Sequence, residues 1–478
     1  MNVPSILTTI AALALSPWFN AVAADAPAWR AALDAYVTEQ IETAGLAAAF
    51  VTVVSADEVL YAKGFGETRL RSGMPVGPHT AFEIGSLTKS MTALAVLRLH
   101  EQGALDIDAP VQAYLPWFRV ADEEASRTIT LRHLLSHSAG LPTISHGVVW
   151  RDFARIDSSI EQGVRALAGV ELATDPGEAF QYANMGYATL GAVIEAVTGE
   201  SWSTHVERTL FEPLGMRASA ASPEGRDGLQ LAQAYTWRLG RRASVPALSR
   251  FTAPAGSLNV SSGTDMGRYL QAWLSPSGGG LVTPAIRAEA FRGHVRAGDG
   301  DRAGLGWFVS ELHGERVVFH GGGTAGATTS MALLPERGLG VIVLTNSMTS
   351  PAPAIGREAL DVIVGESPAP AGPDVGRFTS YVLTGISAGG LALVALLTLR
   401  VARRSRGHDA RRRSWVHAAR TVAVSIVAGG LWVVLPPLVT SAGMPAPFGV
   451  RGYPFDVLVA LIVLLGVPTA WSAYYLAT

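Results

Sequence analysis

The chain of 478 residues contains no cysteine. This absence excludes disulfide bonds, thiolate nucleophiles and cysteine-ligated metal sites, and it leaves the cellular compartment open. Any covalent catalysis therefore falls to a serine.

Lysine is almost absent as well, since only two lysines stand against 35 arginines. Arginine stays protonated at any pH a protein meets, whereas a desolvated lysine can become neutral and take a proton from a hydroxyl. One lysine, Lys89, follows Ser86 by three residues. If residues 86–98 form a helix, the two side chains share a face, and Ser86 lies in the first turn, where the amide dipoles favour negative charge.

A Ser-x-x-Lys spacing is common by itself, and the alternative is a solvated helical lysine. The apolar residues that follow Lys89 instead predict a buried helix, in which an unpaired lysine would be costly. We expect Lys89 to be paired, neutral or both, which suits a general base.

Long apolar runs lie at both ends of the chain. Residues 1–24 resemble a secretory signal peptide, although their start lacks Lys and Arg and an uncleaved anchor is the alternative. Runs at about 378–399, 421–440 and 455–476 approach the length of transmembrane helices. By the positive-inside rule the arginine-rich loop 400–420 is cytoplasmic. This predicts a bacterial inner-membrane protein whose catalytic domain is periplasmic, on the extracytoplasmic side.

Charge argues against nucleic acid as a partner. Eight arginines and one aspartate give loop 400–420 a net charge of +7, so the rest of the chain carries about −9 against a total of −2. An acidic remainder of this size disfavours nucleic-acid binding.

Between the apolar ends, residues 25–365 read as one domain, closed by a Pro-rich linker at 366–377 and a membrane domain at 378–478. Strand patterns occupy both ends of the domain and helical patterns its middle, which predicts an α/β (α+β) fold: one antiparallel sheet built from both ends, with an inserted helical region. The expected strands are 46–54, 58–65, 305–312, 316–320, 328–334 and 340–345, and the expected helices 90–102, 131–136, 187–197 and 203–210.

Three motifs occur in order along this domain: Ser86-Leu87-Thr88-Lys89, Tyr182-Ala183-Asn184 and His320-Gly321-Gly322-Gly323-Thr324. Together with stretches 134–142, 211–216, 305–307 and 341–346, they resemble the serine β-lactamase and penicillin-binding-protein superfamily. The resemblance is to its class C and D-aminopeptidase-like (S12-type) branch and covers about residues 30–362. It implies the β-lactamase-like fold, with no cofactor and no metal.

The resemblance also implies roles for individual residues. Ser86 would be the nucleophile that forms an acyl-enzyme, Lys89 its proton acceptor and Tyr182 a second acid/base group. Asn184, expected in an extended loop, would bind the substrate amide and orient the lysine. The backbone N–H groups of Ser86 and Gly323 would form the oxyanion hole, and Gly322 and His320 would belong to the substrate-binding strand.

His320 departs from the family pattern. A lysine, within Lys-Thr-Gly, usually stands there and helps to hold a substrate carboxylate, whereas a neutral imidazole attracts anions weakly near pH 7. Efficient β-lactam hydrolysis is therefore put in doubt, and esterases or non-classical peptidases are favoured.

Two other interpretations of the motifs are weaker. His320-Gly321-Gly322-Gly323 also resembles the oxyanion loop of α/β-hydrolases, but the matching elbow, residues 385–389, lies inside the first apolar run. His133 and His137 have i, i+4 spacing but no third ligand nearby, so we interpret them as structural.

The overall architecture resembles the membrane-anchored prodrug-activating peptidases of bacterial natural-product pathways, such as the colibactin-maturing peptidase. It implies a serine hydrolase that cleaves an amide next to an acylated D-residue. Alternatives are a carboxylesterase, a β-lactamase or D,D-peptidase, and a non-catalytic penicillin-binding sensor. The expected partners are a small acylated peptide, ester or lactam substrate and the lipid bilayer.

Overall fold

The computed structural model describes residues 26–143, 159–238, 241–245, 259–298, 300–324, 326–347 and 352–367. The expected signal peptide, most of the expected linker, the three apolar runs and the arginine-rich loop lie outside these residues. Within the described ranges, no helix is both long and apolar enough to cross a membrane.

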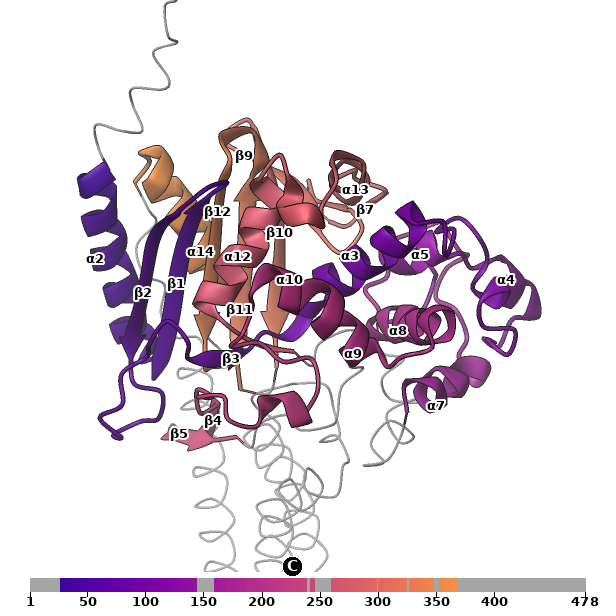
Figure 1. The fold of residues 1–478 in the computed structure, drawn as a ribbon, viewed down its shortest axis with the longest axis horizontal. Coiled ribbons are helices and arrows are strands. Elements are labelled where there is room, and N and C mark those ends of the chain that lie inside the picture. Colours follow the sequence, from indigo (N-terminus) through magenta and orange to yellow (C-terminus); the bar gives the residue numbers. More distant parts are fainter. Residues whose placement is uncertain are drawn as a thin grey trace, which may run out of the picture.

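An eight-stranded antiparallel sheet forms the centre of the domain (Figure 1). Its strands are β1 (Ala48–Ser55), β2 (Val59–Gly66), β7 (Val295–Arg296), β8 (Arg302–Ala303), β9 (Phe308–Leu312), β10 (Glu315–Gly323), β11 (Thr328–Leu334) and β12 (Leu339–Thr345). Their order in the sheet is β2-β1-β12-β11-β10-β9-β8-β7. Strands from the two ends of the domain are neighbours, because β1 pairs with β12 and places Val51 opposite Val343. The prediction of a sheet built from both ends is confirmed.

Helices cover both faces of this sheet, so its central strands are apolar on both sides. In β12, Val341 and Val343 join the core under α2 (Ala26–Ala44) and α14 (Ala352–Val364). Ile342 and Leu344 join the larger core on the opposite face, where α12 (Gly263–Leu274) packs on β1 and β12. Alternate side chains of a strand point to opposite faces, which explains why this strand reads as a continuous apolar run.

The middle of the chain forms a helical region beside the sheet (Figure 1). The helices of this part are α3 (Thr88–Glu101), α4 (Glu123–Thr128), α5 (Leu131–Leu135), α7 (Ile160–Arg165), α8 (Asn184–Thr198), α9 (Trp202–Val206), α10 (Glu212–Leu214) and α13 (Pro284–Ala290). The central helix, α3, is buried along almost its whole length because α8, α9 and α13 pack around it.

Two short strand pairs connect the layers. They are β3 (Ala81–Glu83) with β6 (Val260–Ser262), and β4 (Tyr235–Arg238) with β5 (Arg241–Ser244). Strand β3 leads directly into the turn that carries Ser86, so the β3–β6 pair fixes the entry to that turn.

Most of the expected elements are present, and the differences have local causes. The strand expected at 305–312 begins only at Phe308, because Gly306 has a φ of +79° and packs against α3, where a Cβ at this residue would lie 2.5 Å from the Ala93 methyl. The helix expected at 203–210 is divided into α9 and a π-helical turn, Glu207–Phe211.

Candidate active site

Ser86 lies in a 3₁₀ turn, Gly85–Leu87, that runs into α3. The expected helix is present, but it begins at Thr88, so Ser86 precedes the helix instead of occupying its first turn. Ile84 and Leu87 are fully buried on either side and anchor the turn in the core, whereas Ser86 itself is partly exposed. The hydroxyl is thus held at the edge of the core, where a substrate can reach it.

Lys89 is completely buried and lies between two of the expected partners. Its Nζ donates to Ser86 Oγ at 3.1 Å and to Asn184 Oδ1 at 2.6 Å. Nζ also lies 4.9 Å from the ring centroid of Tyr182 and 5.6 Å from that of Tyr187. A buried lysine needs such partners, and here one of them is a serine hydroxyl within reach of proton transfer.

Tyr182 and Asn184 reach this lysine from the start of α8. Asn184 is the first residue of that helix and Ala183 its extended N-cap, so the expectation that Asn184 lies in an extended loop is wrong. The backbone changes from extended to helical between Ala183 and Asn184, and this change lets both Tyr182 and Asn184 approach Lys89. Tyr182 remains partly exposed.

The glycines of β10 bring the second oxyanion candidate to the nucleophile turn. Gly85 has a φ of +54°, and a Cβ on it would lie 2.6 Å from the Gly323 nitrogen. The backbone amide of Gly323 therefore lies beside the residue that precedes Ser86. The two expected oxyanion donors, the amides of Ser86 and Gly323, thus come from backbone segments that are in contact.

Gly322 serves a different purpose from its neighbour. It is buried, and a Cβ there would lie 2.2 Å from the Ile84 carbonyl oxygen and 2.1 Å from Thr329 Oγ1. Thr329 Oγ1 donates to the same Ile84 oxygen at 2.9 Å. Gly322 thus permits the close packing of β10 on the turn that carries Ser86.

His320 lies on the same buried face of β10 and is only 3% exposed. Its ring is 6.5 Å from that of Tyr182 and 5.3 Å from that of Phe308, centroid to centroid. Burial, followed by the nearby charge of Lys89, lowers the pKa of His320 from 6.5 to about 3. The imidazole is therefore neutral at physiological pH and supplies no positive charge for a substrate carboxylate.

Sequence reasoning assigned no role to two supporting residues of the site, although the third motif includes Thr324. Thr324 follows Gly323, and its Oγ1 donates to Glu83 Oε2 at 2.6 Å. Tyr187 lies one helical turn into α8, faces Lys89 and donates its hydroxyl proton to the Leu135 carbonyl oxygen at 2.7 Å. The place of Thr324 at the end of the third motif is the only sequence signal for one of these two residues. No sequence signal pointed to Tyr187.

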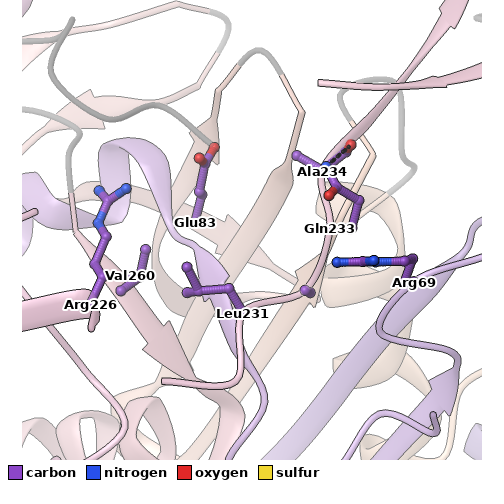
Figure 2. Close-up of a pocket in the computed structure, with 8 residues that line it drawn as sticks. Arg69, Glu83, Arg226, Leu231, Gln233, Ala234 and Val260 are labelled. Atoms are coloured by element: carbon purple, nitrogen blue, oxygen red, sulfur yellow. Dashed lines mark hydrogen bonds between the residues drawn. The ribbon is translucent and has the colours of Figure 1, made fainter. Parts of the chain in front are cut away.

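Glu83 also lines a cavity of about 220 Å³ (Figure 2). Ser86, Lys89 and Tyr182 do not line it, so it is separate from the nucleophile. Its walls are formed by Arg69, Glu83, Arg226, Leu231, Ala232, Gln233, Ala234 and Val260.

His133 and His137, interpreted from the sequence as structural, each accept a backbone N–H. His133 Nδ1 accepts the Thr130 N–H in the cap of α5, whereas His137 Nδ1 accepts the Ala183 N–H. Among the described residues, no group of three or more acidic or histidine side chains is placed to hold a metal ion.

A model of the Beta-lactamase family matches residues 33–366. The chain belongs to the Beta-lactamase family. It is a serine hydrolase of the β-lactamase and penicillin-binding-protein superfamily, and the α/β-hydrolase alternative is excluded because His320–Gly323 lies within a strand of this fold.

Individual members show the range of this family. The chain is 30% identical over 333 residues to penicillin-binding protein 4 of Amycolatopsis lactamdurans, covering 66% of this chain and 84% of that protein. The octameric penicillin-binding protein homologue of Pyrococcus abyssi is 28% identical, with a TM-score of 0.64 over 71% of this chain and 78% of its own. EstCE1, a hydrolase with promiscuous acyltransferase activity, has the same fold at 23% identity. Its TM-score is 0.62, over 71% of this chain and 99% of EstCE1.

Proposed function

We propose that this member of the Beta-lactamase family is a membrane-anchored, exported peptidase that cleaves an amide bond through a Ser86 acyl-enzyme. The observation that carries the catalytic part is Lys89, buried and in hydrogen-bond contact with both Ser86 Oγ and Asn184 Oδ1. A base in that position can take the hydroxyl proton as the oxygen attacks a carbonyl carbon.

Acylation and deacylation require only proton transfers among Ser86, Lys89, Tyr182 and water. Ser86 Oγ forms a bond to the carbonyl carbon while its proton passes to Lys89, and the developing oxyanion accepts from the Ser86 and Gly323 amides. The C–N bond then breaks, and the leaving amine receives a proton through Tyr182, whose ring centroid lies 4.9 Å from Lys89 Nζ. A water molecule then passes a proton through Tyr182 to Lys89 while its oxygen attacks the acyl carbon; the ester bond to Ser86 Oγ breaks, Lys89 returns the proton to that oxygen, and the acid leaves.

The surroundings of His320 support a neutral acyl substrate. His320 is uncharged and packs against Phe308, which is itself in contact with Phe180 and Phe319. An uncharged, aromatic environment suits an acylated residue better than a free carboxylate. We propose a capped substrate of the N-acyl-D-aminoacyl amide type, which the bilayer would concentrate near an anchored enzyme.

The second candidate is a carboxylesterase with the same catalytic residues, which the neutral His320 favours equally. Purified full-length protein in detergent should hydrolyse an N-acyl-D-asparaginyl amide faster than its L-isomer and faster than a p-nitrophenyl ester. Ester turnover without amide turnover would select the esterase. If a fluorophosphonate probe labels neither protein, or labels Ser86→Ala as strongly as the wild type, both the peptidase and the esterase proposals are wrong.

The proposed topology has a direct test because the chain contains no cysteine. Single cysteines can be introduced at Asp57, exposed in the β1–β2 turn, and at Ser405, in the arginine-rich loop. A membrane-impermeant maleimide should label Asp57→Cys in intact cells and Ser405→Cys only after permeabilisation. The reverse pattern would overturn the periplasmic placement.

A further inference from the structure

Five aromatic side chains form a closed circuit next to Lys89. The circuit runs from His137 to Phe180 (5.8 Å between ring centroids), Phe308 (5.9 Å), His320 (5.3 Å), Tyr182 (6.5 Å) and back to His137 (4.4 Å). Three of these residues come from the helical region and two from the sheet. The shortest contact in the circuit joins His137 to Tyr182.

His137 also holds the backbone on both sides of Tyr182. Its Nδ1 accepts the Ala183 N–H at 3.2 Å, and its carbonyl oxygen accepts the Gln181 N–H at 2.7 Å. Residues 181 and 183 are thus both attached to His137, and residue 182 between them lies against its ring at an interplanar angle of 34°. The imidazole and the backbone carbonyl of His137 therefore fix the position of the Tyr182 phenol.

The backbone of His137 is in an unusual conformation. Its φ is +57°, although the residue is only 6% exposed and a glycine would adopt this angle without strain. A buried, left-handed residue that is not glycine persists where the surrounding structure requires its side chain. Here the contacts of that side chain lead to Tyr182, Ala183 and Tyr187.

We propose that His137 is a positioning residue that fixes Tyr182 relative to Lys89 for proton transfer. This rests on the proposed function, in which Tyr182 carries a proton to the leaving group. Since Nδ1 accepts an N–H, the proton of the neutral imidazole is on Nε2. Burial and the charge of Lys89 lower the pKa of His137 well below its ordinary value, so this tautomer persists across the working pH range.

Three variants separate the contributions of the ring and the acceptor. His137→Gly relieves the backbone and removes both, His137→Asn tolerates the left-handed angle and retains an acceptor, and His137→Phe retains a ring without the acceptor. For hydrolysis of an N-acyl-D-asparaginyl amide, whose leaving amine needs a proton, we expect His137→Gly to lower kcat about 10- to 100-fold with KM within about twofold. His137→Asn should recover part of this loss.

The decisive measurement repeats the substitution in a Tyr182→Phe background. If His137 acts through Tyr182, His137→Gly should cost little further kcat once the phenol is gone. A merely structural role would lower the melting temperature and reduce kcat equally in both backgrounds, which would overturn the proposal. His133→Asn is the matched control: this neighbouring histidine caps α5 through Thr130, and its loss should affect stability but not kcat.

The same set distinguishes this inference from the proposed function. If Tyr182→Phe retains full activity, the acid/base assignment of Tyr182 is wrong. The proposed positioning role of His137 is then wrong as well. If Tyr182→Phe loses activity but the two substitutions are additive, only the role of His137 fails.

Discussion

Gly85 and Gly323 approach so closely that a Cβ atom on Gly85 would lie 2.6 Å from the nitrogen of Gly323. The contact joins the turn that carries Ser86, the proposed nucleophile, to β10, which carries the proposed second oxyanion donor. The approach of the two backbone segments thus depends on the absence of a side chain at Gly85.

Gly85→Ala should therefore separate these two elements. The new methyl group would displace β10, and a left-handed alanine costs about 1–2 kcal/mol in addition. We expect kcat to fall about 10²- to 10³-fold, the effect of losing one oxyanion donor. Gly103→Ala is the control, because Gly103 has a φ of +72° but a methyl group on it would meet no atom within 4 Å. Equal kinetics in the two variants would contradict the role of the contact.

Asn184→Asp should move the pH dependence of the reaction. A carboxylate would replace the amide oxygen that lies 2.6 Å from Lys89 Nζ, and an opposite charge favours the protonated ammonium. Because the neutral amine is the proposed base, the acidic limb of kcat/KM should move to higher pH by about one to three units. Asn184→Ala lacks the negative charge and should lower the rate without this upward movement. An unchanged limb in Asn184→Asp would contradict Lys89 as the base.

His320 should make the folded domain sensitive to acid. Its pKa is about 3 in the folded protein against 6.5 ordinarily, so the unfolded chain binds the proton more readily. Stability is therefore greatest above about pH 6.5 and falls as the pH decreases toward about 3. From about pH 7 to about pH 5, His320→Gln should lose about 2 kcal/mol less unfolding free energy than the wild type, measured by denaturant titration. Parallel curves for the two proteins would contradict the buried neutral imidazole.

Thr324→Val should loosen the end of β10. The variant loses the 2.6 Å hydrogen bond to Glu83, and a bond to a charged group contributes about 1.5–3 kcal/mol. Because Thr324 follows Gly323, we expect kcat to fall along with the melting temperature. Thr324→Ser keeps the hydroxyl and should restore both. A full loss in Thr324→Ser would indicate that the methyl group, not the hydrogen bond, is what matters.

Much of the fold followed from residue patterns. The strand patterns of residues 46–54 and 58–65 predicted the first hairpin, and the strand at 328–334 has the expected bounds. Helix α8 was expected at 187–197 but begins three residues earlier, at Asn184. That start depends on the extended N-cap Ala183, whose N–H is bound by His137, 46 residues earlier in the chain, so local sequence could not place it.

The sequence by itself determined the chemistry available to this protein. A chain without cysteine, with one lysine three residues from a serine before a buried helix, has a Ser/Lys pair as its proposed means of covalent catalysis. The short spacing, through a 3₁₀ turn into α3, brings those two groups together. Tertiary structure alone decided what surrounds them. The contact of Gly85 with Gly323, the neutral state of His320 and the contact of His137 with Tyr182 each join residues 45 or more positions apart, or depend on burial by such residues. Their causes are the packing of β10 on the turn that carries Ser86 and the packing of α5 on α8, which no local pattern encodes.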